Sequence, residues 1–473
     1  MHQSMYPHYA KSPNWIRIRD FIYNFSKLTK TQLDTSVIRH SIVGRLRSIR
    51  ESSRNLWFLD LEQEGHRSQI ILNRSSFKDP NHFEQCKAGL SRGNFIEASG
   101  LVTKSLTDEL SLMADSIQTL SSCQINLPDK CLDTENRMRY RHLDMLSNAD
   151  FVRDLKERSF LTRRLRGYLD GEGFIEVETP ILSPKYGGAA ARPFTTQHIH
   201  DIPLNLRIAP EINLKQLVIG GLDRVYELGK VFRNEGFDAS HNPEFTMCEF
   251  YEAYNDCQGM MKRLEGLLEH VGEGKVLKPP FKSLEICQVL EDVLVIQNLE
   301  TLLDCEESSK RVLLEAAKKK GRVLDVSLSL PKILDKLIEG FVEPFCSGPT
   351  FLTGHPMAIS PLAKAKPSKS MTLADRFELF VDGHELANGF TEQNDPELQA
   401  AAFQRQTKEG QLGDVEVPPG DLEFLEAMKA GMPPTAGCGI GIDRLTMLLT
   451  AKSHIRDVLT FPMLRPLTKA SSD

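Results

Sequence analysis

The pattern of apolar and polar positions divides the chain into regions of different character. Between residues 38 and 126, short apolar runs alternate with turn-forming residues, which is typical of β-strands. A helical pattern at about 80–87 separates the third run from the fourth. Five strands with one helix at this position predict an OB barrel, a fold that often binds single-stranded nucleic acid. The expected strands cover residues 42–46, 56–61, 68–72, 96–102 and 110–112.

After residue 126, helical and strand patterns are mixed. An apolar stripe at helical spacing covers 149–172 and stops at Gly173, and residues 174–180 have the pattern of a strand. Residues 282–343 are rich in leucine and charge, which predicts a small helical insertion with a solvated face. We expect an N-terminal extension (1–35), a barrel domain (36–130), a linker (131–148) and a second domain (149–473).

The segment from Arg233 to Tyr251 is the most informative part of the chain. It joins two alternating stretches through a turn that contains Gly236 and Pro243, which predicts a hairpin with a long loop. Glu249 and Tyr251 fall on one face of the second strand by period two. A guanidinium, an aromatic ring and carboxylates on one surface are the groups needed to hold a nucleoside triphosphate and an amine-bearing partner.

A second hairpin is predicted at Asp382-Gly383, a strong two-residue turn signal. Glu378 and Glu385 flank this turn on one face, where two carboxylates would repel each other without a cation. Such oxygen ligands suit Mg²⁺, although two solvent-facing glutamates on an edge hairpin remain the alternative.

The strand after this turn raises a difficulty of geometry. Asn388, Phe390 and Glu392 share one face by period two, but Glu385 lies three residues before Asn388. A regular strand would point Glu385 and Asn388 to opposite sides. We therefore expect a bulge, or a local change at Gly389, to re-aim the strand.

These segments together resemble the class II lysyl-tRNA synthetases. Residues 233–251 resemble motif 2 of that class and residues 437–444 resemble motif 3, while 187–194, 207–211, 354–364 and 377–395 resemble patterns of the lysine enzymes. The resemblance extends from about Tyr6 to Pro466, and several ordered motifs at family-like spacing make a chance match very improbable.

The resemblance implies an α+β architecture. An N-terminal five-stranded OB β-barrel that binds the anticodon would precede a class II catalytic domain, which is an antiparallel sheet flanked by helices. Residues 149–180 resemble motif 1, which implies a homodimer. The implied reaction joins L-lysine to ATP, releases pyrophosphate and passes the lysyl group to the 3′ end of tRNA(Lys), with Mg²⁺ as cofactor. The lysine carboxylate is already a nucleophile, so the first step needs placement and charge neutralisation, not a base.

The resemblance also assigns roles to individual residues. Arg233 and Arg444 would be catalytic, at the α- and γ-phosphates. ATP contacts would come from Arg233, Glu235, His241, Asn242, Phe245, Glu378 and Arg444. Lysine contacts would come from Gly188, Glu211, Glu249, Tyr251, Asn388, Phe390 and Glu392. The metal would be bound by Glu378 and Glu385, and the anticodon by Phe58, Gln69 and Glu109. For Phe58, simple core packing beside Trp57 is the alternative.

Composition changes this picture little. The 473 residues are 40% hydrophobic and 26% charged, an ordinary globular composition, and no window approaches the roughly 18 apolar residues of a membrane span. The net charge of −6 does not indicate a nucleic-acid binder, yet residues 40–54 are basic. This basic stretch fits either a solvated face or a surface that follows an RNA backbone. Nine cysteines without a Cys-x-x-Cys pair argue against structural zinc and a disulfide framework.

Several alternatives stay open. Residues 1–30 are basic and poor in acid, as in a transit peptide, but the resemblance begins near Tyr6; we expect a cytoplasmic protein, with the mitochondrion as the alternative. A relative that lysylates a protein would lack the barrel. An aspartate- or asparagine-specific relative is disfavoured by Glu249 and Glu392. A catalytically silent RNA-binding paralogue is disfavoured by the intact Arg233 and Arg444.

Overall fold

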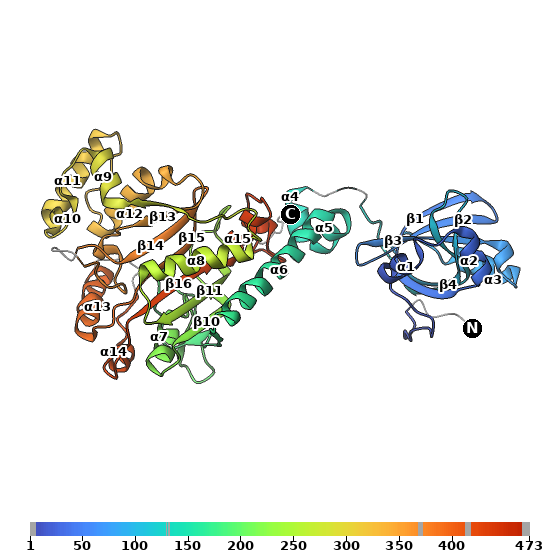
Figure 1. Ribbon diagram of the computed structural model, residues 1–473, viewed down its shortest axis with the longest axis horizontal. Helices are drawn as coiled ribbons and strands as arrows, with labels where there is room; N and C mark the ends of the chain where they lie inside the picture. Colours follow the sequence, from blue (N-terminus) through green and yellow to red (C-terminus); the bar gives the residue numbers. More distant parts are fainter. Residues whose placement is uncertain (1–5, 129, 131–132, 368–371, 412–417, 466–473) are drawn as a thin grey trace, which may run out of the picture. The chain divides into compact units, whose positions relative to one another are not determined.

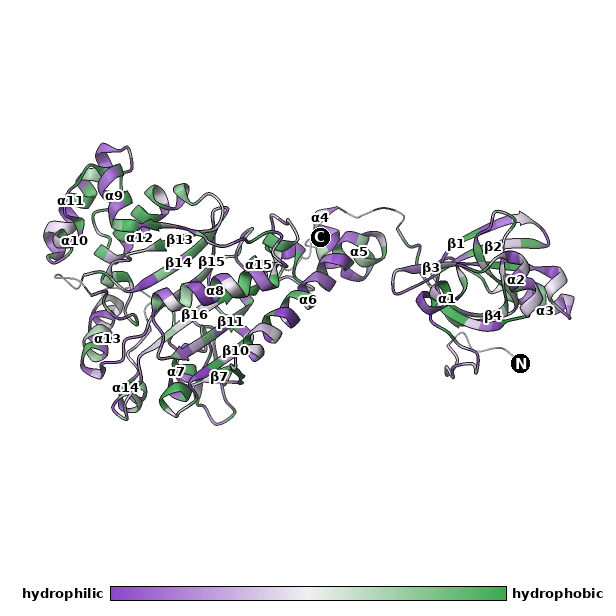
Figure 2. Cartoon of the chain, viewed as in Figure 1, coloured by the Kyte–Doolittle hydropathy of each residue, from purple (hydrophilic) through white to green (hydrophobic). Residues whose placement is uncertain are grey.

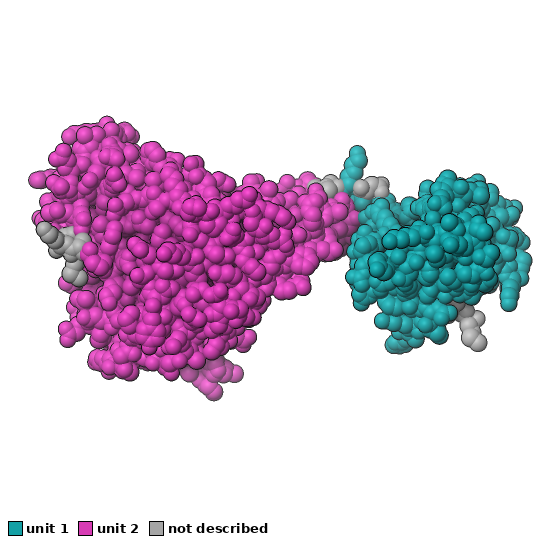
Figure 3. Space-filling view, in the orientation of Figure 1, with its two compact units in different colours: residues 1–132 teal, residues 133–473 magenta. Residues whose placement is uncertain are grey.

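The computed structural model describes residues 6–128, 130, 133–367, 372–411 and 418–465. It divides the chain into two compact units, residues 1–132 and 133–473 (Figure 3). Each unit has a hydrophobic core of its own. Eight of the nine cysteines lie in the described part and are free thiols, while Cys131 lies outside it. Among the described residues, none of the helices combines the length and the apolar character that crossing a membrane requires.

The first unit is a closed barrel with the strand order β1-β2-β3-β5-β4, which confirms the predicted OB fold (Figure 1). Helix α3 (Pro80–Ala88) lies between the third and fourth strands, as predicted; Pro80 occupies its first turn and the Asp79 side chain caps it. The strands extend beyond their apolar runs because backbone pairing continues through polar residues. They are β1 (Arg39–Ser53), β2 (Leu56–Gln63), β3 (His66–Asn73), β4 (Phe95–Lys104) and β5 (Leu110–Ser121).

Two helices precede the barrel within residues 1–35, the range expected as an extension, and one of them ends just beyond it. They are α1 (Ile18–Phe25) and α2 (Lys30–Ser36). Ile18, Phe21 and Leu33 are fully buried and belong to the same hydrophobic cluster as the barrel strands. The chain from Ile18 onward is therefore part of the folded barrel unit.

The second unit is built on an eight-stranded sheet of order β12-β13-β14-β15-β16-β11-β10-β6 (Figure 1). Helices α6 (Ala149–Gly171) and α8 (Cys257–Val271) pack together and bury apolar residues against it. Figure 2 shows apolar residues along the central strands, with hydrophilic residues interspersed on the two helices. The strands are β6 (Ile175–Glu176), β10 (Arg224–Phe232), β11 (Glu244–Ala253), β12 (Lys282–Glu285), β13 (Thr350–Thr353), β14 (Arg376–Val381), β15 (His384–Thr391) and β16 (Thr435–Gly441).

Smaller elements complete this unit. A three-stranded sheet of order β7-β9-β8 and three further helices surround the large sheet. They are β7 (Leu182–Ser183), β8 (Thr195–Gln197), β9 (Pro203–Leu206), α7 (Glu211–Ile219), α13 (Pro396–Gln411) and α14 (Leu422–Met428). Helix α15 (Ile442–Leu449) directly follows β16 and presents Ile442 and Leu445 to the core.

The structure differs from the sequence expectations in three places. Of residues 174–180, only Ile175 and Glu176 form a strand, β6, which pairs in parallel with β10; the Val177 backbone N–H still donates to the Tyr226 carbonyl, and the strand does not continue to Pro180. The region 282–343 begins with an edge strand, β12, and only then becomes helical with a core of its own. The region 131–148 contains two short helices. The helices are α4 (Thr134–Arg139), α5 (Arg141–Ser147), α9 (Ile286–Leu294), α10 (Leu299–Leu302), α11 (Glu306–Lys319) and α12 (Leu330–Phe341).

Candidate active site

A cavity of about 360 Å³ opens above the middle of the eight-stranded sheet. It is lined by residues from the motif 2 hairpin, from the β14–β15 hairpin and from the glycine-rich strand β16. The expected site residues found in its lining are Gly188, Glu211, Arg233, Glu235, His241, Asn242, Phe245, Glu249, Tyr251, Glu385, Asn388, Phe390, Glu392 and Arg444. Glu378 is not among them.

The floor of the cavity depends on glycine in β16. In the sheet register, Gly437 lies between Tyr251 of β11 and Phe390 of β15, and Gly439 lies between Glu249 and Asn388. A Cβ on Gly437 would lie 2.3 Å from Tyr251 Cε1 and 2.6 Å from Glu392 Oε1. The bare backbone of β16 thus leaves room for the side chains that its neighbours project over it.

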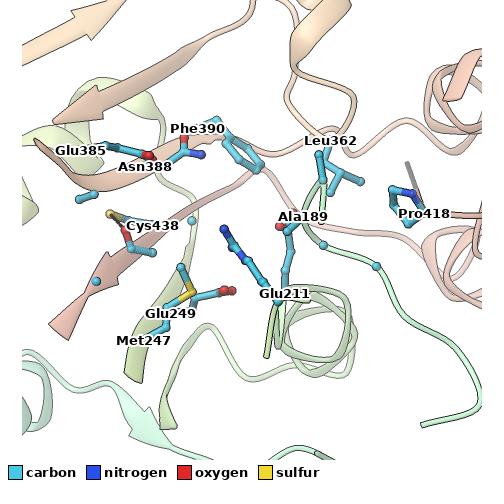
Figure 4. Close-up of a pocket in the computed structure, with 18 of the residues that line it drawn as sticks. Ala189, Glu211, Met247, Glu249, Leu362, Glu385, Asn388, Phe390, Pro418 and Cys438 are labelled. Carbon is cyan, nitrogen blue, oxygen red and sulfur yellow. Dashed lines mark hydrogen bonds between the residues drawn. The ribbon is translucent and has the colours of Figure 1, made fainter. Parts of the chain in front are cut away.

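One end of the cavity is acidic. Glu249 rises from β11, Glu211 lies at the start of α7, and Asn388 and Phe390 lie on the opposite side (Figure 4). The Tyr251 hydroxyl donates a hydrogen bond of 3.0 Å to Glu249 Oε2. Burial and the neighbouring Glu211 raise the pKa of Glu249 to about 8.

Glu392 completes the acidic end. It is 1% exposed, and burial raises its pKa well above the ordinary value. The structure adds a residue that the sequence analysis missed: Lys215, fully buried on α7, whose Nζ donates to Glu211 Oε1 at 2.5 Å and forms an ion pair with Glu392. The spacing of four between Glu211 and Lys215 on a helix could have indicated the first contact, but not the second.

The other end of the cavity carries the two expected arginines. The Arg233 guanidinium lies 5.2 Å from the centre of the Phe245 ring, so cation and aromatic ring are held together. Arg444 Nη1 donates to the Glu385 carbonyl at 2.6 Å, and its Nη2 lies 3.0 Å from His241 Nε2. Both guanidiniums line the cavity, which makes this end suited to phosphate groups.

Helix α15, which carries Arg444, is held to motifs 1 and 2 by one carboxylate. Asp443 accepts hydrogen bonds from Arg158 Nη1 of α6 at 2.5 Å and from the Thr246 backbone N–H of β11 at 2.7 Å. Arg158 Nη2 also donates to Thr246 Oγ1 at 3.0 Å. These contacts fix the position from which Arg444 reaches the cavity.

The β14–β15 hairpin has the predicted two-residue turn, in which Asp382 and Gly383 have φ values of 49° and 80°. Leu379 is paired with Ala387 and Phe380 with Glu385, which leaves Leu386 as an extra residue. This bulge turns Glu385 to the side of Asn388, and both line the cavity. The expectation of a bulge is confirmed.

The two carboxylates expected at the metal differ in their surroundings. Glu385 lines the cavity, whereas Glu378 Oε1 accepts from Arg376 Nη2 at 2.5 Å and Glu378 Oε2 lies 3.3 Å from His355 Nε2. Burial opposes ionisation of Glu378, but His355 and Arg376 outweigh it and hold its pKa at about 2. Within the described residues, no group of three or more His, Cys, Asp or Glu side chains is arranged around a metal position.

In the barrel, two of the three expected anticodon residues touch. Gln69 Nε2 donates to Glu109 Oε2 at 2.7 Å. Phe58 is paired with Ile71, two residues from Gln69 on β3, so Phe58 and Gln69 share a face. Phe58 does not belong to the barrel core, to which Leu59 and Leu61 of the same strand contribute. Its position therefore favours a surface role over core packing.

The basic stretch on β1 is partly neutralised by neighbouring acids. Arg47 Nε lies 3.4 Å from Glu62 and Arg50 Nη2 lies 3.5 Å from Asp60. Arg45 lies over the Phe95 ring at 4.2 Å. The stretch is thus less strongly positive than its sequence indicates.

Comparison with known proteins agrees with the geometry of both units. Residues 133–465 match the family described as tRNA synthetases class II (D, K and N), and residues 40–120 match the OB-fold nucleic acid binding domain. The chain is 38% identical to the mitochondrial lysine–tRNA ligase of Schizosaccharomyces pombe, over 98% of this chain and 91% of the relative. It is 39% identical to a probable cytoplasmic lysine–tRNA ligase of Enterocytozoon bieneusi, over 93% and 89%.

A bacterial protein is equally similar. The lysine–tRNA ligase of Streptococcus pneumoniae is 40% identical over 93% of this chain and 90% of its own length. The match therefore spans the barrel, the acidic pocket and the arginine-lined end of the cavity together. The chain belongs to the lysine–tRNA ligase family of the class II tRNA synthetases, which are ATP-dependent ligases.

Proposed function

We propose that the protein activates L-lysine with ATP and transfers the lysyl group to the 3′ end of tRNA(Lys). The observation that carries this proposal is the division of one cavity into an acidic end and a guanidinium end. Glu211, Glu249 and Glu392 suit the two ammonium groups of lysine. Arg233 and Arg444 suit the phosphates of ATP.

Discrimination for lysine follows from the depth of the acidic end. The ε-ammonium would lie against Glu249 and Glu392, with Tyr251 fixing the Glu249 carboxylate, and the α-ammonium against Glu211. Gly188 leaves room for the Glu211 side chain, since a Cβ at position 188 would lie 2.9 Å from Glu211 Cβ. A shorter or neutral side chain would leave buried carboxylates unpaired, at a cost of roughly a few kcal/mol.

The activation step needs placement more than acid–base chemistry. The lysine carboxylate attacks the α-phosphorus of ATP, and pyrophosphate leaves with the bond electrons. Arg233 would neutralise the charge that develops on the α-phosphate, and Arg444 would bind the γ-phosphate. Phe245 would stack on adenine. Glu235 and Asn242 would orient the nucleotide, and His241 supports Arg444 directly.

The donor set around the hairpin fits Mg²⁺ bound together with ATP. Glu385 offers a carboxylate at the cavity. Burial raises the pKa of Glu385, and the charge of Glu378 nearby adds to this rise. Mg²⁺ in proteins often takes only one or two carboxylates and completes its shell with phosphate and water oxygens. When bound, it would neutralise phosphate charge during pyrophosphate release.

The barrel would bind the anticodon. Phe58 offers a ring for base stacking, and the hydrogen-bonded pair of Gln69 and Glu109 offers an amide and a carboxylate for base edges. A protein-lysylating enzyme would not need this unit, so its presence favours tRNA as the acceptor.

We also propose a homodimer through the motif 1 region. Phe160 and Ile175 in this segment are 41% and 50% exposed, and Ile181 and Leu182 directly after it are 45% and 49% exposed. Apolar residues concentrated in this way are typical of a contact surface. Light scattering of the purified chain would give twice the monomer mass; a monomer at micromolar concentration would contradict the proposal.

The compartment is proposed to be the cytoplasm, with the mitochondrion as the alternative. The burial of Ile18 in the barrel core limits a cleavable segment to the residues before it. Imaging of the chain with a C-terminal fluorescent tag would decide: diffuse cytosolic signal is expected, and mitochondrial signal would support the alternative.

The function is tested by charging of tRNA. Purified protein is incubated with labelled lysine, ATP, Mg²⁺ and total tRNA, and the charged species are identified by sequencing. Lysine on tRNA(Lys) alone is the expected result. Failure to charge any tRNA by a folded protein would refute the proposal and favour the silent RNA-binding paralogue.

A further inference from the structure

Lys215 lies where a cation is unexpected, directly behind the wall of a pocket that we assign to a cationic substrate. It is fully buried on α7, and its side chain is not part of the cavity lining. Its Nζ donates to Glu211 Oε1 and forms an ion pair with Glu392. The rings of Phe390 and Phe424 lie 5.4 Å and 5.9 Å from the same Nζ. Burial of a lysine to this extent requires such compensation.

The charges around the pocket explain why a cation is needed there. Glu211, Glu249 and Glu392 all line the cavity. Burial raises the pKa of Glu249 and of Glu392, and the nearby carboxylate of Glu211 adds to both rises. Burial acts to lower the pKa of Lys215, but Glu211 and Glu392 outweigh it and raise the pKa, so Lys215 stays charged. The three carboxylates and Lys215 together carry a charge of −2 when all are ionised.

We propose that Lys215 is a built-in counter-cation that sets the charge of the lysine pocket and positions Glu211 and Glu392 for the two ammonium groups of the substrate. The inference rests on the proposed function, since it takes lysine as the occupant. The two ammonium groups of bound lysine then balance the charge of −2 carried by the three carboxylates and Lys215. Lys215 does not touch the substrate; it is a positioning residue that acts through the two carboxylates.

The proposal separates lysine binding from ATP binding. Without Lys215, the two carboxylates would take up protons or repel each other, and lysine would have to displace those protons. In Lys215→Met, we expect the KM for lysine in ATP–pyrophosphate exchange to rise roughly 10- to 100-fold. The KM for ATP should stay within about threefold, because Arg233 and Arg444 lie at the other end of the cavity.

A double variant distinguishes charge balance from simple damage. Lys215→Met with Glu392→Gln removes the cation and one carboxylate together, which restores the charge of −2 and removes the unpaired buried acid. We expect its KM for lysine to be at least about fivefold lower than the product of the two single effects predicts. A KM for the double variant equal to the product of the two single effects would overturn the proposal. If Lys215→Met alone does not fold, the double variant is compared with Glu392→Gln alone: a KM for lysine no higher than that of Glu392→Gln supports charge balance, and a KM about tenfold higher overturns it.

The control breaks another lysine–carboxylate ion pair of the same unit, in which the carboxylate is buried and the lysine is partly exposed. Lys452 Nζ lies 3.0 Å from the buried carboxylate of Asp154. Lys452→Met should lower the melting temperature without changing the KM for lysine more than about twofold. If the wild-type protein shows no lysine-dependent exchange, the proposed function fails. If the wild type is active and Lys215→Met keeps its KM for lysine, only the role of Lys215 fails.

Discussion

Lysine binding should release a proton at neutral pH, because Glu249 must be ionised to hold an ammonium group. Its pKa is raised to about 8 by burial and by Glu211. At pH 7 roughly one tenth of the empty protein would carry an ionised Glu249. Binding of lysine would ionise the remainder and release about 0.9 of a proton per site from Glu249.

The same pKa determines how strongly the KM for lysine should depend on pH. Below about pH 7.5, the ionised fraction of Glu249 falls about tenfold for each unit by which the pH decreases. The KM for lysine should therefore fall about tenfold from pH 6 to pH 7 and level off above pH 8. A tenfold change corresponds to about 1.4 kcal/mol. The KM for ATP should change much less, since the groups proposed to bind its phosphates are guanidiniums, which do not lose their proton in proteins.

In the protein without lysine, the stability of the fold should decrease as the pH rises, whereas the affinity for lysine increases. The pKa of Glu249 is higher in the folded state than its ordinary value. The protonated carboxyl therefore stabilises the fold at low pH, and this contribution is lost as the pH rises through about 8. Saturating lysine supplies the missing counter-charge. The rise in melting temperature on adding lysine should therefore be larger at pH 8 than at pH 6, once the lysine concentration saturates at both.

Calorimetric titration in two buffers of different ionisation enthalpy measures the released proton directly. Glu249→Gln is the control: it should release less proton and bind lysine weakly at every pH. A KM for lysine that is flat from pH 6 to pH 8, with no proton release at pH 7, would refute the assignment of Glu249 to the ammonium group.

Three further predictions test other parts of the molecule. Arg444→Lys should lower the rate of ATP–pyrophosphate exchange by about 100-fold or more, since an ammonium cannot replace the guanidinium held by the Glu385 carbonyl; an unchanged rate would contradict its role at the phosphates. Gly437→Ala should raise the KM for lysine by about tenfold or more but spare that for ATP, because the added Cβ would lie 2.3 Å from Tyr251 Cε1; equal changes in both would argue against the assigned floor. Phe58→Ala should lower kcat/KM for tRNA about tenfold through lost stacking and leave exchange unchanged; a matching loss in exchange would show damage beyond the barrel.

Local patterns predicted much of this structure. The barrel and the hairpin at Asp382-Gly383 follow from alternation and turn chemistry, which act between neighbours in the sequence. The same holds for the shared face of Glu249 and Tyr251. These features need no knowledge of what packs against them.

Other features depend on contacts between distant segments. The burial of α1 in the barrel core and the pairing of Lys215 with Glu392 join residues that are far apart in the chain. Glu378 was expected to face the metal, yet its bonds to Arg376 and His355 could not be read from its place in the hairpin. The bulge at Leu386 was inferred only because a regular strand would have separated two site residues.

The acidic end of the cavity is proposed to select lysine for adenylation. The most direct test is ATP–pyrophosphate exchange with each of the twenty amino acids in parallel, in the presence of Mg²⁺. We expect exchange with lysine alone, and loss of that exchange at the same lysine concentration in Glu249→Gln. Exchange with none of them, by a folded protein, would contradict it, as would equal exchange with a neutral amino acid.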